Sequence, residues 1–344
     1  MCRYNVDATD AQILLGYSDL FPGTAPELIP EIQKLNMHKA ISIISELITL
    51  RHGKMKPINV CGYSIQLPYE AFLKKIILCL GDASCKDLST NPIFRKNQHV
   101  ISIQMLLILL KKIIAYGNYE TLNQVDYKIT DADYAKIIQL QLIVVDEVCQ
   151  NEEHSFDRGH FIFSTYHLNH HLPDSGRFLR MYYMLEILNK DADNFPEDIR
   201  GEYRNYYDDF STKYGITTTQ YTSILFCELQ PYYLEEKPIT HMSAWRTVAD
   251  TYKKAENREI FSKALELLSA KPEELRDWAI ESQDRQWDFS KFLEAPFLQD
   301  NEGRYISISD YTLSNAFFEK LFWLIRDCYP ENDSRAMAFY GRLF

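Results

Sequence analysis

Apolar residues recur at intervals of three and four along most of this chain. That spacing places them on one face of an α-helix. The clearest run contains Ile138, Leu142, Val145 and Cys149, and Thr130 stands before it as an N-cap. The pattern therefore predicts a helix that Thr130 opens.

An earlier apolar run predicts a second helix in the first sixty residues. Asn36 is placed to cap it, and the helix is expected to end near Gly53. Ile44, Leu47 and Ile48 share its inner face.

The most hydrophobic segment covers residues 99–116. Its uncharged part ends at Lys111 after about a dozen residues, whereas a helix that spans a bilayer needs about 20 apolar residues. We therefore expect a buried core helix and no membrane partner. Lys111 and Lys112 are interpreted as solvated basic residues at a helix end.

Capping signals in the middle of the chain predict two helices joined by a tight turn. The first helix starts at Asn194, with Pro196 in its first turn, where the missing proline N–H is tolerated. Gly215 is placed to end that helix with a positive φ. Thr217 and Gln220 have the spacing of a capping box, which opens the next helix.

The complete pattern is typical of a mainly α-helical protein built as a multi-helical array. Two extended parts are expected: a short segment near 58–67 and one β-hairpin near 297–308, where alternating residues surround a turn that contains Gly303. The later helices are predicted near 244–255, 257–269, 272–283 and 310–328.

Residues 230–243 carry two prolines and no helical period, so they are the predicted domain boundary. The expected domains are a helical domain, 1–235, and a smaller helical domain with the β-hairpin, 236–344.

The chain has 344 residues, a formal net charge of −11 and only 12 glycines. An acidic surface disfavours nucleic acid as a general partner, because phosphate contacts need positive charge. The seven cysteines are scattered without a C-x-x-C pair, and the first ten residues lack an apolar stretch. Both features favour a cytoplasmic location.

Histidines concentrate between residues 154 and 171. On one helix His160, His167 and His171 share a face, and His167 and His171 have the i, i+4 spacing of two metal ligands. The simpler interpretation is structural, with imidazoles beside the last carbonyls of a helix before Pro173. The alternative is a metal-dependent hydrolase that holds a divalent ion such as Zn²⁺ on these three histidines.

Common catalytic and phosphate-binding motifs are missing from the sequence, so no catalytic residue is assigned. Helices followed by a hairpin over 257–308 suggest a winged helix. However, residues 258–310 contain seven basic and twelve acidic side chains, which makes DNA binding a second, less favoured alternative.

Helical spacing continues through Ala336, Tyr340 and Phe344, so we expect this last segment to continue or to dock elsewhere. The run FLEAPFLQDNEGRYISISDYTLSNAFFEKLFWLIRD with FYGRLF, within residues 292–344, resembles the region that precedes a nuclease domain of the PD-(D/E)XK type in bacterial multidomain proteins, including phage-defence proteins. A more diffuse similarity surrounds residues 163–188. The resemblance implies a non-catalytic helical scaffold or interaction region, such as the regulatory part of a defence nuclease. Its expected partner is a protein or a missing C-terminal domain.

Overall fold

The computed structural model describes a subset of the chain, and the following statements concern that subset. It comprises residues 13–21, 23–55, 58–60, 63–65, 98–151, 206, 208–222, 224, 255–300, 305–309, 312, 313, 316, 320–330, 333 and 334. This part is mainly α-helical with short strands, which confirms the predicted fold class.

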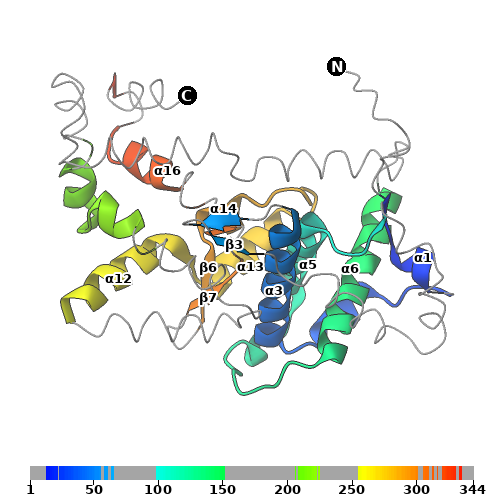
Figure 1. Ribbon diagram of the computed structural model, residues 1–344. Helices are drawn as coiled ribbons and strands as arrows, with labels where there is room; N and C mark the ends of the chain where they lie inside the picture. The colour runs from blue at the N-terminus through cyan, green and yellow to red at the C-terminus, as the bar shows by residue number, and fades with distance from the viewer. Residues whose placement is uncertain are drawn as a thin grey trace.

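Helix α5 (Ile103–Tyr116) lies at the centre of the first group of helices (Figure 1). All of its residues except Lys112 and Tyr116 are buried. A helix that is apolar on every side must be covered on every side. The covering elements are α2 (Leu28–Gln33), α3 (Met37–Met55), α6 (Asp131–Asn151) and α13 (Pro272–Glu281). The prediction of a buried core helix is confirmed.

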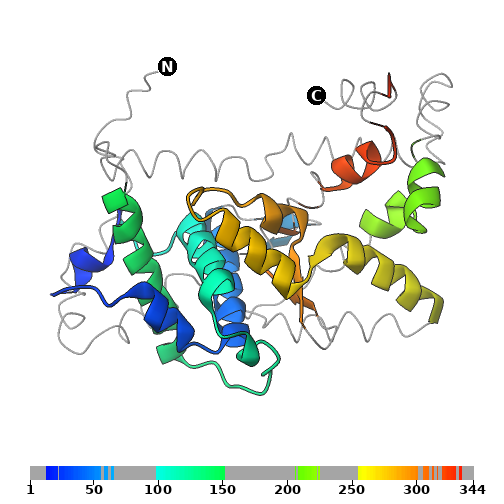
Figure 2. The same ribbon diagram turned by 180° about the vertical axis from the view of Figure 1, so that it is seen from behind.

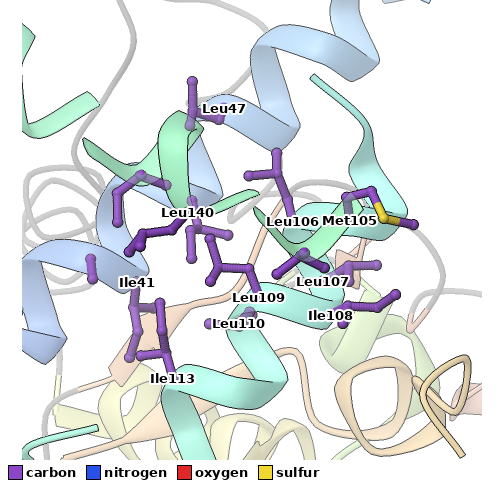
Figure 3. Packing of buried hydrophobic residues seen from close by; sticks show 14 of the residues in the cluster. Ile41, Leu47, Met105, Leu106, Leu107, Ile108, Leu109, Leu110, Ile113 and Leu140 are labelled. Atoms are coloured by element: carbon purple, nitrogen blue, oxygen red, sulfur yellow. The ribbon is translucent and has the colours of Figure 1, made fainter. Parts of the chain in front are cut away.

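The interior of this group is formed by branched aliphatic side chains from three helices (Figure 3). Ile41 and Leu47 of α3, Leu106 and Leu109 of α5 and Leu140 of α6 are each at most 1% exposed. Burying such a side chain contributes about 1.5–3 kcal/mol, so this contact is the main source of cohesion between the three helices.

Polar side chains fix where these helices begin. Asn36 Oδ1 accepts a hydrogen bond from the Lys39 amide at 2.8 Å, as the predicted cap requires. Thr130 precedes α6, and its amide and hydroxyl both donate to Asp133, at 2.8 and 2.7 Å. These contacts place both helix starts where the sequence predicted them.

Helix α5 begins later than its apolar run suggests. The run starts at residue 99, but Gln98–His99 forms strand β4, which pairs in parallel with β1 (Ile13–Leu14). The backbone at the turn is then bound by Gln141 of α6: its Oε1 accepts from the Ser102 amide at 3.1 Å, and its Nε2 donates to Val100 O at 2.8 Å. Long-range pairing therefore delays the helix by four residues.

The extended segment and the hairpin are both present. Strands β2 (Ile58–Val60) and β3 (Tyr63–Ile65) pair antiparallel inside the predicted segment 58–67. Strands β6 (Phe297–Gln299) and β7 (Tyr305–Ser307) form the predicted hairpin.

A third strand, β5 (Ser269–Ala270), joins the hairpin. It pairs in parallel with β6, so the sheet order is β5-β6-β7. The crossover between these two strands contains α13 and α14 (Ser290–Glu294). The sequence analysis missed β5 because a two-residue strand after a helix has no period of its own.

The turn between the two middle helices confirms its prediction. Gly215 has φ +70°, which L-residues with a side chain rarely adopt. The Thr217 amide donates to Gln220 Oε1 at 2.8 Å, and the Gln220 amide donates to Thr217 Oγ1 at 3.1 Å. This is the reciprocal capping box. The expected helix start at Asn194 lies outside the described residues.

A second hydrophobic cluster surrounds this turn. It contains residues from 206–224, from α12 (Ala255–Leu268) and from α16 (Leu321–Arg326), with Phe210 and Tyr221 fully buried. Both views place these elements at the opposite end of the molecule from α6 (Figures 1 and 2). Strand β6 connects the ends, because Phe297 belongs to this cluster and Leu298 to the first.

The predicted domain boundary, residues 230–243, lies outside the described residues. The first cluster contains residues from both sides of it: Leu275, Phe292 and Ile306 pack with the core around α5. Among the described helices, none has the length and apolar character required to cross a membrane.

Candidate functional site

The three histidines expected from the sequence, His160, His167 and His171, lie outside the described residues, so their hypothesis stays a prediction. Within the described part, no group of three or more His, Cys, Asp or Glu side chains is arranged to hold a metal ion.

A row of polar side chains lies on the buried side of α3. His38, Ser42 and Ser45 have no exposed surface, and Glu46 is 3% exposed. Intervals of four and three place them on one face of the helix. Buried polar groups are costly unless they are hydrogen-bonded, so a row of this kind has to be explained by its partners.

The hydroxyl of Tyr127 joins the first two members of the row. It lies 2.6 Å from His38 Nδ1 and 2.9 Å from Ser42 Oγ. Ser42 Oγ also lies 3.0 Å from the His38 carbonyl oxygen, to which it donates when its hydrogen points that way. Burial, with the charge of Glu46 as a smaller contribution, raises the pKa of Tyr127 to about 12. Tyr127 therefore keeps its proton at neutral pH.

The hydroxyl chain has two possible arrangements of its hydrogens. When Ser42 donates to its own helix, Tyr127 donates to Ser42 and His38 Nδ1–H donates to Tyr127. When Ser42 donates to Tyr127 instead, the Tyr127 hydroxyl donates to an unprotonated Nδ1. The cluster can thus reverse the direction of two hydrogen bonds, His38–Tyr127 and Tyr127–Ser42, without moving a heavy atom, while Ser42 exchanges the His38 carbonyl for Tyr127 as its acceptor.

Glu46 has one hydrogen-bond partner among the described side chains, the hydroxyl of Tyr134, which donates to its Oε2. Burial raises the pKa of Glu46 from its ordinary value of 4.5 to about 7, although the Tyr134 hydrogen bond acts in the opposite direction. Burial, followed by the charge of Glu46, raises the pKa of Tyr134 well above its usual range. Glu46 therefore exchanges a proton with water near neutral pH, whereas Tyr127 and Tyr134 keep theirs.

Sequence reasoning missed this row, but a signal for it exists. Ala40, Ile41, Ile43, Ile44 and Ile48 of α3 are all buried and lie on more than one face. A helix that is apolar on several sides is enclosed, so its polar residues are enclosed with it.

Lys111 is a second buried polar group, and its predicted role as a solvated charge is wrong. It is 4% exposed, and its Nζ donates to the carbonyl oxygens of Ser282, Arg285 and Asp288 at 2.9, 3.0 and 3.2 Å. The ammonium also lies 4.8 Å from the centre of the Trp278 ring. Lys111 therefore binds α5 to the C-cap of α13 and to the turns that follow it.

Burial of the Lys111 ammonium changes its pKa. Burial lowers the pKa of Lys111, and the nearby carboxylate of Asp288 offsets part of that effect. All three ammonium hydrogens have backbone acceptors, so the group holds structure rather than a ligand.

Asp146 of α6 has a comparable structural role, because it binds the backbone at the start of α1 (Tyr17–Leu20). It accepts from the amide of Ser18 at 2.7 Å and from its hydroxyl at 3.1 Å. A Cβ atom on Gly16 would lie 1.9 Å from Asp146 Oδ1. The glycine is required here because the carboxylate approaches the backbone so closely.

The order of elements from α12 to β7 agrees with that of a winged helix, but the details do not favour DNA binding. The helix before the hairpin, α14, has five residues, which is about 7.5 Å of helix. A recognition helix lies along the major groove with several side chains on base edges. Glu294 ends α14, where it would repel phosphates.

Comparison with models of known protein families, with curated proteins and with solved structures found no match. The geometry of the described residues is therefore the basis for the function proposed below.

Proposed function

We propose that this chain is a non-catalytic helical scaffold that binds a protein partner. The observation that carries the proposal is the outer surface of α16. Leu321 and Ile325 of this helix are fully buried in the second cluster, whereas Trp323 keeps 49% of its surface exposed.

Trp323 is accompanied by a cation on the same helix. The guanidinium carbon of Arg326 lies 5.5 Å from the centre of the Trp323 ring. Tryptophan and arginine are the residue types most enriched among those that dominate protein–protein binding energy. A half-exposed indole that a guanidinium covers is well suited to such a role, because it is held in place before the partner arrives.

The internal polar groups support a scaffold for a different reason. Lys111 donates its hydrogen bonds to backbone carbonyls, and Gln141 bonds to the backbone of the turn before α5. Asp146 accepts hydrogen bonds from Ser18 at the start of α1. These side chains stabilise contacts between elements distant in sequence. A catalytic group needs an acceptor or donor that remains available to substrate.

The test compares full chains purified from the native host as tagged proteins, with Trp323→Ala against Ile29→Ala. Ile29 is the matched control, since it is 41% exposed on α2, away from α16. Loss of a central tryptophan typically costs at least 2 kcal/mol of binding, or about 30-fold in affinity. We expect one protein to be retained by the wild type and by Ile29→Ala but lost by Trp323→Ala, with unchanged thermal unfolding.

Two outcomes would contradict the scaffold proposal. One is equal retention by both variants. The other is a stoichiometric divalent metal that disappears in His167→Ala/His171→Ala, because this would favour the metal-dependent hydrolase. The resemblance of residues 292–344 makes a PD-(D/E)XK-type nuclease domain the first partner to test.

A further inference from the structure

We propose that Glu46, Tyr134, Tyr127, His38 and Ser42 form a proton-operated latch between α3 and α6. The latch is closed when Glu46 carries a proton, and it loosens when that proton is lost to water. Nothing in this inference depends on the scaffold proposal.

The surroundings of Glu46 favour its protonated form. Glu46 is 3% exposed, and its hydrogen bond comes from a neutral hydroxyl. A carboxylate in such a place loses its hydration and gains one hydrogen bond, whereas a carboxylic acid loses much less. The cations in the neighbouring turns have other partners: Lys39 pairs with Asp133 at 2.6 Å, and Lys136 pairs with Glu31 at 2.5 Å.

The elements packed against α3 bring titratable groups of both signs. The described members are Lys39 and His38 on α3, Lys111, Lys112 and Tyr116 on α5, Tyr119 and Glu120 on η2 (Tyr119–Thr121), Asp126, Tyr127 and Lys128 before α6, Asp131, Asp133, Tyr134, Lys136, Asp146 and Glu147 on α6, and Tyr305 on β7. The lysines of α5 are bound elsewhere, to backbone carbonyls and to Glu147. The groups that couple electrostatically to Glu46 are the hydroxyls of Tyr127 and Tyr134. Both stay neutral, so neither compensates the carboxylate.

The position of the transition follows from the burial of Glu46. Burial raises its pKa to about 7 in the closed state, against 4.5 when water reaches it. The closed state therefore holds the proton more tightly, and its advantage is complete below about pH 4.5 and is lost as the pH rises through about 7. Over that window the equilibrium constant for opening increases by roughly 300-fold.

The contact between α3 and α6 is the part of the fold that responds to ionisation of Glu46. Tyr134 belongs to α6 and Glu46 to α3, so ionisation of Glu46 acts on the surface that holds these helices together. Loosening it would also release Tyr127, whose hydroxyl joins His38 to Ser42 on the same face. The contact between α5 and α13 contains neither Glu46 nor Tyr134, so we expect it to keep its packing.

Hydrogen–deuterium exchange of the full chain tests the latch. Exchange of α3 and α6 amides is measured between about pH 5 and about pH 8.5, and each rate is divided by the intrinsic rate at that pH. We expect opening of the wild type to increase with pH and that of Glu46→Gln to stay constant, since glutamine mimics the protonated acid. Glu27→Gln, an exposed glutamate on another element, should behave as the wild type does.

The same pH dependence in Glu46→Gln would overturn the proposal. A second variant keeps the test decisive if Glu46→Gln folds poorly. Tyr134→Phe removes the hydrogen bond that favours the charged form, so its transition should move to higher pH. A transition that does not move, or moves to lower pH, also contradicts the latch.

Discussion

Replacing Lys111 by methionine is the most informative perturbation of the fold. Methionine keeps an unbranched apolar side chain that is one atom shorter, with sulfur in place of Cδ, and it removes the ammonium group. Three backbone carbonyls at and after the C-cap of α13 then lose the hydrogen bond from the ammonium: those of Ser282, Arg285 and Asp288. The cation over Trp278 is lost as well.

The magnitude follows from two opposing contributions. Each hydrogen bond from a charged donor contributes about 1.5–3 kcal/mol, so three are worth roughly 5–9 kcal/mol. Removing the ammonium also removes its desolvation cost, which is several kcal/mol for a buried ion. The expected net loss of unfolding free energy is therefore about 3–5 kcal/mol, which is the usual result of removing one partner from a buried charged contact.

The assay is urea unfolding of the full chain, with Lys112→Met as a matched control. Lys112 is the next residue on α5, and it forms a surface pair with Glu147 at 3.0 Å with both side chains about a third exposed. Such pairs contribute at most about 1 kcal/mol. If Lys111→Met loses no more free energy than Lys112→Met, the contact between Lys111 and α13 does not hold the fold together.

Three further predictions concern single positions. Gly16→Ala should destabilise the chain by about 1–3 kcal/mol, because its Cβ meets Asp146 Oδ1. In a double-mutant cycle with Asp146→Ala, measured by urea unfolding, the two losses of unfolding free energy should be less than additive. Strict additivity would contradict the close approach. Glu46→Gln should be more stable than the wild type by up to about 3 kcal/mol at pH 8 and equal to it near pH 4.5, because the folded-state pKa of about 7 exceeds the ordinary 4.5. Calorimetric melting at both pH values checks this. A gain in stability that is greater at low pH would refute it. Gly215→Ala should lower stability by about 1 kcal/mol because φ is +70°, and unchanged thermal unfolding would show that the turn relaxes freely.

Local signals predicted the elements that depend on local physics. The turn around Gly215 and Thr217 was predictable because a positive φ and a capping box involve residues three positions apart. The buried position of α5 was predictable because its apolar residues cover the whole circumference of the helix. The β6–β7 hairpin needs only a short connection, so its pattern is also local.

Long-range contacts account for what the sequence did not predict. Lys111 looks like a solvated lysine because its three acceptors lie more than 170 positions away in the chain. The start of α5 is delayed by a strand that pairs with residues near the N-terminus, Ile13–Leu14. The hydrogen-bond partner of Glu46 could not be predicted locally, since Tyr134 is contributed by α6. Among the candidate residues, the histidine cluster stays a prediction.

The central claim, that the exposed face of α16 binds a protein partner, is tested most directly by photo-crosslinking in cells. A photoreactive phenylalanine analogue replaces Trp323 in one full-length chain and Ile29 in another, the two side chains being similarly exposed. The account predicts that position 323 crosslinks to one defined segment of one protein and that position 29 does not. Crosslinks of equal yield from both positions, or adducts from position 323 to nucleic acid alone, would contradict it.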